Sequence, residues 1–285
     1  MKSYAILLFL LVFVFLSGCT LLGQQQPTDQ QKGQAIGVII KSFKPGESKI
    51  YAGQSVTFYL TVENVGEEDA EEVKAVLTGL GTDWSGELNY QKEIGFLPKR
   101  LPNSPGGLSY LEWEVTSPED KDIPNCPATV KVFYKYASTA NGRIKVMSQE
   151  YKRTHPQETK GIEGFIASQA PIQISVETVQ PFTYIKPGQI GTIPLTFKNV
   201  GQGSPYINKM DDKKVVIEKI TIDGNECINH NFPKEVRIDP TSGCSITCQF
   251  YVPEVTDYTT LPLEVKLSYY YYVEATTSVS VSRLL

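Results

Sequence analysis

The chain is poor in the residues that most enzymes use for chemistry. It holds only two histidines, His155 and His230, among its 285 residues, and both lie in polar segments. Neither is flanked by a nucleophile elbow, and the Gly-x-Ser-x-Gly pattern of many serine hydrolases is absent. The sequence therefore predicts no catalytic residue, no cofactor and a protein that is not an enzyme.

Clusters of basic residues and helical periodicity are also lacking. Lysine and arginine number 27 against 31 aspartates and glutamates, for a net charge of −4, whereas a nucleic-acid-binding domain carries a basic stripe or patch. Apolar Ala and Leu rarely recur at helical spacing, while Tyr, Thr and Val are plentiful, which favours strands. We therefore expect an all-β fold and no nucleic-acid partner.

The chain begins with a long apolar run. Met1 and Lys2 precede apolar residues from Tyr4 onward, which is typical of a secretory signal peptide. The run ends in Leu16-Ser17-Gly18-Cys19, which resembles the lipobox of prokaryotic lipoproteins. The resemblance implies a signal peptide over 1–18, a diacylglyceryl group on Cys19 as the link to membrane lipid, and an extracytoplasmic location anchored to the cell membrane. An uncleaved transmembrane anchor is the alternative, because 4–22 reaches the roughly 17–25 residues that span a bilayer.

A polar tether follows the anchor. Residues 19–35 comprise Cys19 and a glutamine-rich stretch, with six glutamines and no apolar side chain between Gly23 and Gln34. Such a composition cannot bury apolar surface, so we expect a disordered tether.

The rest of the chain is a tandem duplication. Residues 53–66 and 188–201 are identical at eight of fourteen positions, and the blocks near Pro118 and Pro127 recur at the same offset of 135 residues. Each copy reads as short strands of alternating apolar and polar residues, with Asn141-Gly142 predicted to form a hairpin turn. We expect two Ig-like β-sandwiches, over 36–150 and 169–285, joined by a linker at 151–168.

One segment of each copy is similar to a known family. The strand over 56–63, followed by Asn64-Val65-Gly66 and then Glu68-Asp69-Ala70 and a new strand, resembles the CARDB-type Ig-like domains of bacteria and archaea. The second copy keeps Asn199-Val200-Gly201 but continues into a longer polar segment. The resemblance implies surface adhesion, spacing or a module beside other domains, and it transfers no catalytic residue.

The remaining cysteines point to one disulfide. Cys244 and Cys248 lie about 13 Å apart on one extended strand, too far for a bond to each other. Cys227 is therefore expected to pair with one of them, and Cys244 at the start of the strand is slightly favoured over Cys248. The state of Cys126 stays open. No metal site is predicted, because these cysteines do not converge and the acidic run at 67–72 lacks the ladder of a calcium loop.

Four consecutive tyrosines mark the second copy. Alternation turns Tyr269 and Tyr271 inward and leaves Tyr270 and Tyr272 outward, where tyrosines are common at interfaces. We take Tyr270 and Tyr272 as the candidate contact for an envelope protein or a surface glycan. The expected function is a non-enzymatic binding, spacer or scaffold module, with an accessory subunit of a secretion, transport or envelope-assembly complex as the alternative.

Overall fold

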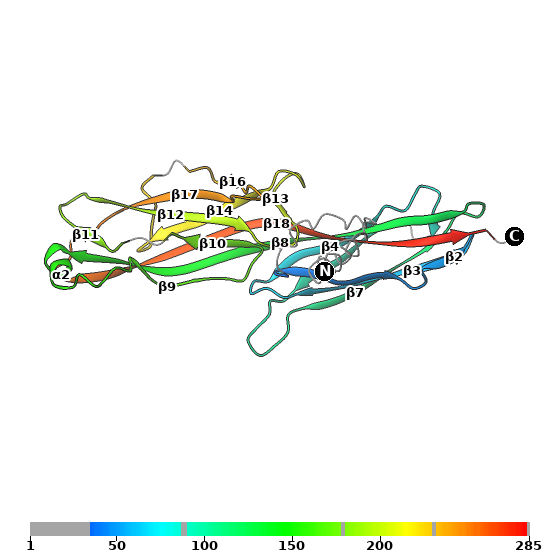
Figure 1. The fold of residues 1–285 in the computed structure, drawn as a ribbon, viewed down its shortest axis with the longest axis horizontal. Coiled ribbons are helices and arrows are strands. Elements are labelled where there is room, and N and C mark those ends of the chain that lie inside the picture. The colour runs from blue at the N-terminus through cyan, green and yellow to red at the C-terminus, as the bar shows by residue number, and fades with distance from the viewer. Residues whose placement is uncertain (1–34, 87–89, 178–179, 230–231, 284–285) are drawn as a thin grey trace, which may run out of the picture. The chain divides into compact units, whose positions relative to one another are not determined.

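The structure is a computed structural model that describes residues 35–86, 90–177, 180–229 and 232–283. Residues 33–285 form one compact unit that is almost entirely β-structure (Figure 1). Among the described residues the only helix is α2 (Gln149–Thr154), and none is long and apolar enough to cross a bilayer. The predicted all-β fold is confirmed, whereas the signal segment and Cys19 lie outside the described residues.

Two small sheets each belong to one copy of the repeat. The first has the strand order β1-β3-β7-β5, and the second has the order β10-β12-β17. Their strands are β1 (Val38–Pro45), β3 (Ser55–Asn64), β5 (Ser85–Gly86), β7 (Leu108–Thr116), β10 (Ile172–Val176), β12 (Ile190–Asn199) and β17 (Cys244–Tyr251).

One large sheet is shared by both copies. Its main path is β15-β14-β18-β8-β4-β6, and five short strands join it at the sides. Its strands are β2 (Lys49–Tyr51), β4 (Ala70–Thr78), β6 (Gln91–Leu97), β8 (Ile123–Ser148), β9 (Ile162–Ala167), β11 (Phe182–Tyr184), β13 (Ser204–Tyr206), β14 (Lys214–Ile222), β15 (Asn225–Glu226), β16 (Glu235–Arg237) and β18 (Tyr258–Ser282).

Residue alternation decides which side chains enter the core. In β3, Val56, Phe58 and Leu60 are buried, whereas the residues between them are partly or fully exposed. Successive side chains of a strand point to opposite faces, so this pattern buries one face of the small sheet. Its buried residues share one core with residues of the large sheet, such as Val130 of β8, and the two layers form a sandwich.

The strands β8 and β18 run through both copies. They contain 26 and 25 residues and pair antiparallel from Cys126↔Val279 to Met147↔Tyr258. Figure 1 shows them side by side through both groups of strands. Each copy therefore contributes one long strand to a ladder that links the two sandwiches.

The hairpin predicted at Asn141-Gly142 is wrong. Both residues continue β8 and pair with Glu264 and Leu263 of β18, and neither has the positive φ that a two-residue hairpin turn requires. The ladder with β18 outcompetes the local turn because it also buries Ile144, which follows the predicted turn.

The segment expected as a linker differs as well. Residues 151–168 complete α2 and supply β9, whose residues Ile166 and Ala167 pair with β8. Lys145 of β8 holds this segment through ion pairs with Glu158 (2.6 Å) and Glu163 (2.8 Å). Because β8 extends past the first copy, the connection packs along it instead of separating two units.

Candidate functional site

The centre of the β8–β18 ladder contains four buried tyrosines. Tyr134 faces Tyr271 and Tyr136 faces Tyr269, with ring centroids 5.7 and 6.4 Å apart. Burial raises the pKa of all four hydroxyls above the ordinary tyrosine value, because the charged form would lose its hydration. The inward orientation predicted for Tyr269 and Tyr271 is confirmed.

Two of these hydroxyls bind the asparagine of the repeated Asn-Val-Gly motif. Tyr136 donates to Oδ1 of Asn64 (3.2 Å), and Tyr271 donates to Oδ1 of Asn199 (2.8 Å). Each hydroxyl also accepts a hydrogen bond from the backbone N–H four residues after its asparagine, at 3.3 and 3.0 Å. The motif therefore fastens a turn to the central ladder, which is a structural role.

The opposite face of the same ladder carries a partly exposed group of rings. Tyr270 and Tyr272 lie there, as the alternation predicts, beside Phe133 of β8 and Tyr206 of β13. Tyr206 stacks on Tyr270 at 5.5 Å, and Phe133 lies 5.9 Å from Tyr272. Nζ of Lys131 lies 5.7 Å from the Tyr272 ring, a cation–π arrangement. We call Phe133, Tyr206, Tyr270 and Tyr272 the aromatic cluster.

Charged groups border the aromatic cluster. The hydroxyl of Tyr270 donates to Glu72 (3.0 Å), and Lys135 pairs with Glu71 (3.2 Å). A cavity of about 410 Å³ opens on this side of the large sheet. Its charged lining consists of Glu68, Asp69, Glu71, Glu218, Lys135 and Lys266. Aromatic rings beside charged groups of both signs suit contact with a protein or glycan, because the rings supply apolar area and the surrounding charged groups supply hydrogen bonds.

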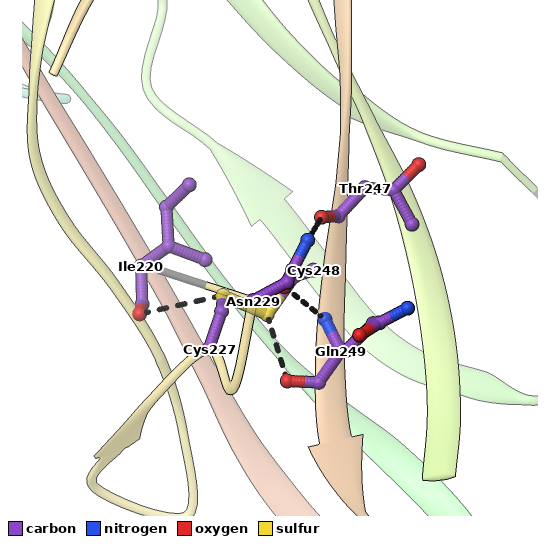
Figure 2. The surroundings of a disulfide bond; sticks show 6 residues. All are labelled: Ile220, Cys227, Asn229, Thr247, Cys248 and Gln249. Atoms are coloured by element: carbon purple, nitrogen blue, oxygen red, sulfur yellow. Dashed lines mark hydrogen bonds between the residues drawn. A yellow bond between two sulfur atoms is a disulfide. The ribbon is translucent and has the colours of Figure 1, made fainter. Parts of the chain in front are cut away.

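The disulfide joins Cys227 to Cys248. The two Cα atoms lie 5.2 Å apart, and the bond closes a sequence separation of 21 residues (Figure 2). Beside it, Asn229 donates to the carbonyl of Thr247 (2.6 Å) and accepts from the N–H of Gln249 (2.8 Å). The loop carrying Cys227 is therefore tied along the edge of β17.

The pairing favoured from the sequence, Cys227 with Cys244, is wrong, and the alternative with Cys248 is correct. The reason is register: the N–H of Ile228 donates to the carbonyl of Gln249 (2.8 Å), which places Cys227 level with Cys248. Cys244 stands at the start of β17 and is a half-buried free thiol, while Cys126 is a buried one.

The structure shows no convergent set of metal ligands in its described part, where no three His, Cys, Asp or Glu side chains meet. His155 ends α2 and stacks on Tyr151 with ring centroids 4.0 Å apart, and His230 lies outside the described residues. The acidic run has separate contacts: Glu68 accepts from Thr139 (2.6 Å), and Asp69 accepts from the N–H of Lys99 (2.8 Å).

Sequence reasoning missed two members of the aromatic cluster. Phe133 lies between buried Val132 and Tyr134 of β8 and therefore points outward. The alternation of inward and outward residues along this strand already indicates that orientation. Tyr206 stands in the polar segment of the second copy, where no pattern predicts that it covers Tyr270. Only the pairing of β13 with β18 brings it there.

Comparisons with known proteins leave the family open. No family model matches the sequence, and no curated protein matches it. Among solved structures, the chain aligns with the crystal structure of the CupB6 tip adhesin from Pseudomonas aeruginosa. That alignment has 9% identity and a TM-score of 0.14, and it covers 89% of this chain and 98% of the other. A likeness at that level carries no argument about function.

Proposed function

We propose that this protein is a non-enzymatic surface lipoprotein whose strand-linked double sandwich acts as a spacer and scaffold outside the cell membrane. The anchor is Cys19, which would carry the lipid, and the glutamine-rich stretch up to residue 35 would separate the folded unit from the lipid surface. A diacylglyceryl group supplies two chains, which is what stable anchoring requires.

The observation that carries the spacer role is the β8–β18 ladder. At about 3.3 Å per residue, a strand of 26 residues extends for ~80 Å. Two such strands, hydrogen-bonded to each other, cross from one sandwich to the other without a loop at the crossing point. A connection of this kind resists bending much better than a single-chain linker, so the unit is suited to holding a contact surface at a set distance.

The disulfide supports an extracytoplasmic location. Disulfides persist mainly in oxidising compartments, and Cys227–Cys248 is formed in a buried setting at the edge of a sheet. A protein exported through a lipoprotein signal would meet such conditions.

The aromatic cluster is the proposed contact surface for an envelope protein or a surface glycan. To test it, Tyr270 and Tyr272 are replaced by serine, and the purified unit is assayed for binding to isolated cell envelopes. The matched control is Tyr251→Ser, which changes an exposed tyrosine (63% exposed) on another strand. We expect at least a tenfold loss for the double variant and none for the control; equal binding by all three would contradict the assignment.

The anchor is tested by metabolic labelling with a fatty-acid analogue. Cys19→Ser should abolish the label, because serine lacks the thiol that would carry the lipid. Unchanged labelling of the variant would overturn the lipoprotein assignment.

The spacer role is tested by crosslinking the full-length protein in cells and identifying attached proteins by mass spectrometry. We expect crosslinks within the chain, between neighbouring copies and to envelope material. A fixed, stoichiometric set of membrane or secretion proteins would contradict the spacer role and favour the accessory-subunit alternative.

A further inference from the structure

The two copies are related by an approximate twofold axis at the centre of the ladder. Lys135 and Tyr270 occupy the same position in the two copies, 135 residues apart, and they also face each other across β8 and β18. Tyr134 is equivalent in sequence to Tyr269, yet it pairs with Tyr271. Tyr271 is equivalent to Tyr136, which in turn pairs with Tyr269. Equivalent residues exchange partners in this way only where a twofold axis passes between the strands.

The hydrogen bonds around this axis obey the same symmetry. Both repeated asparagines, Asn64 and Asn199, accept from a ladder tyrosine and donate to the carbonyl four residues later, at 2.9 Å in each copy. They also accept from the N–H two residues later, at 3.1 and 3.2 Å. The second copy is thus built as a symmetry mate of the first.

Each copy gives the end of its long strand to the other sandwich. We call residues 137–148 of β8 and 273–282 of β18 the exchanged ends. The end of β8 pairs with β11 of the second copy, and the end of β18 pairs with β2 of the first, both in parallel. Three residues in the exchanged end of the first copy are fully buried: Ile144, Val146 and Met147. In the exchanged end of the second copy, Val279 and Val281 are at most 2% exposed. Neither copy therefore completes its own sandwich.

The connection between the copies is separate from this exchange. Thr159 and Lys160 are exposed and lie in a loop between α2 and β9, outside every strand of the ladder. The contacts that unite the copies are made by β8 and β18, on either side of this loop in sequence.

The first copy fits the second copy better than a second molecule of itself. If the first copy paired with a second molecule of itself about the same axis, Lys135 would face another Lys135, and like charges directly opposite are destabilising. In the observed pairing Lys135 faces Tyr270, whose hydroxyl donates to Glu72 of the first copy (3.0 Å).

We propose that residues up to 159 and residues from 160 onward are two mutually completing subunits fused into one chain. They hold together by reciprocal exchange of strand ends, and the covalent connection is not needed once the unit has formed. A cut in the exposed connection would therefore leave the protein intact as a one-to-one complex.

The test inserts a protease recognition sequence between Thr159 and Lys160 of the full chain and cleaves the folded, purified protein. Native mass spectrometry and size-exclusion chromatography then report whether the fragments separate. We expect a single one-to-one complex that dissociates only in denaturant. Two separate monomeric fragments after cleavage would overturn the proposal.

Engineered cysteines distinguish strand exchange from a mere contact between domains. In a background with Cys126→Ala and Cys244→Ala, the pair Thr129→Cys and Thr276→Cys joins two side chains whose hydroxyls lie 2.8 Å apart across the ladder. The control pair is Lys135→Cys and Ser148→Cys, which would be opposite each other only if Asn141-Gly142 formed a hairpin.

After cleavage, the first pair should link the two fragments on a non-reducing gel, and the control pair should form no bond. Fragments that stay together without the Thr129–Thr276 link, or a bond between positions 135 and 148, would overturn reciprocal exchange.

Discussion

Removing the hydroxyl of Tyr136 tests how the repeated motif holds the central ladder. Tyr136→Phe deletes the bond to Asn64 and leaves the N–H of Glu68 without the acceptor that it has in the folded chain. An unsatisfied buried donor costs ~1–3 kcal/mol, so we expect the free energy of unfolding to fall by about 2 kcal/mol. For a folded unit of this size, about 1 kcal/mol lowers Tm by roughly 2–4 °C, which gives a drop of ~4–8 °C.

The measurement is urea unfolding followed by circular dichroism, with calorimetry for Tm. Tyr271→Phe should give a loss of the same size, because its hydroxyl makes the equivalent two bonds in the second copy. The control is Tyr272→Phe, whose hydroxyl has no hydrogen bond among the described residues, and it should change stability by less than about 0.5 kcal/mol. A Tyr136→Phe variant as stable as the wild type would refute the reasoning, as would a Tyr272→Phe control that loses as much free energy of unfolding as Tyr136→Phe.

Three further predictions concern the same unit. Replacing Cys227 and Cys248 together by alanine should lower the free energy of unfolding by about 3 kcal/mol, because the bond closes a separation of 21 residues; a loss below about 1 kcal/mol in denaturant unfolding would contradict this. Gly66→Ala should destabilise by about 2–3 kcal/mol, since the added Cβ would overlap the Tyr136 hydroxyl, whereas Gly81→Ala has open space and should be neutral in the same assay. Because burial raises the pKa of the ladder tyrosines, the stability that their neutral forms contribute is complete below about pH 10 and is lost as the pH rises through the folded-state pKa. Absorbance at 295 nm should show the buried ladder tyrosines ionising only when the protein unfolds. Ionisation of these tyrosines while the protein is still folded would contradict the prediction.

Alternation and repetition made much of the fold predictable. Period-2 alternation predicts a strand over 56–63 and a counterpart in the repeated block 188–201. The structure contains both, as β3 and β12, with the expected faces buried. The same alternation predicts that Tyr269 and Tyr271 point into the core, and both are buried. These inferences succeed because which face of a strand is buried depends on local residue order.

Long-range pairing explains what the sequence could not show. Asn141-Gly142 has strong turn propensity, yet the partner that overrides it, β18, begins more than a hundred residues later. The choice between Cys244 and Cys248 likewise depends on how the loop at Ile228 aligns with β17. Tyr206 could not be placed over Tyr270 because the second copy departs from the repeat in that segment.

The measurement that tests the account most directly is a distance distribution between spin labels in the two sandwiches. Glu112 and Thr247 are exposed and occupy equivalent positions in the two copies. Both are replaced by labelled cysteines in a background with Cys126→Ala and Cys244→Ala, which removes the two free thiols. The control labels Glu112 and Lys49, which lie in one sandwich. If β8 and β18 join the sandwiches into a stiff spacer, the distribution between copies should be about as narrow as the control. A distribution several times broader would show a flexible joint and contradict the spacer role.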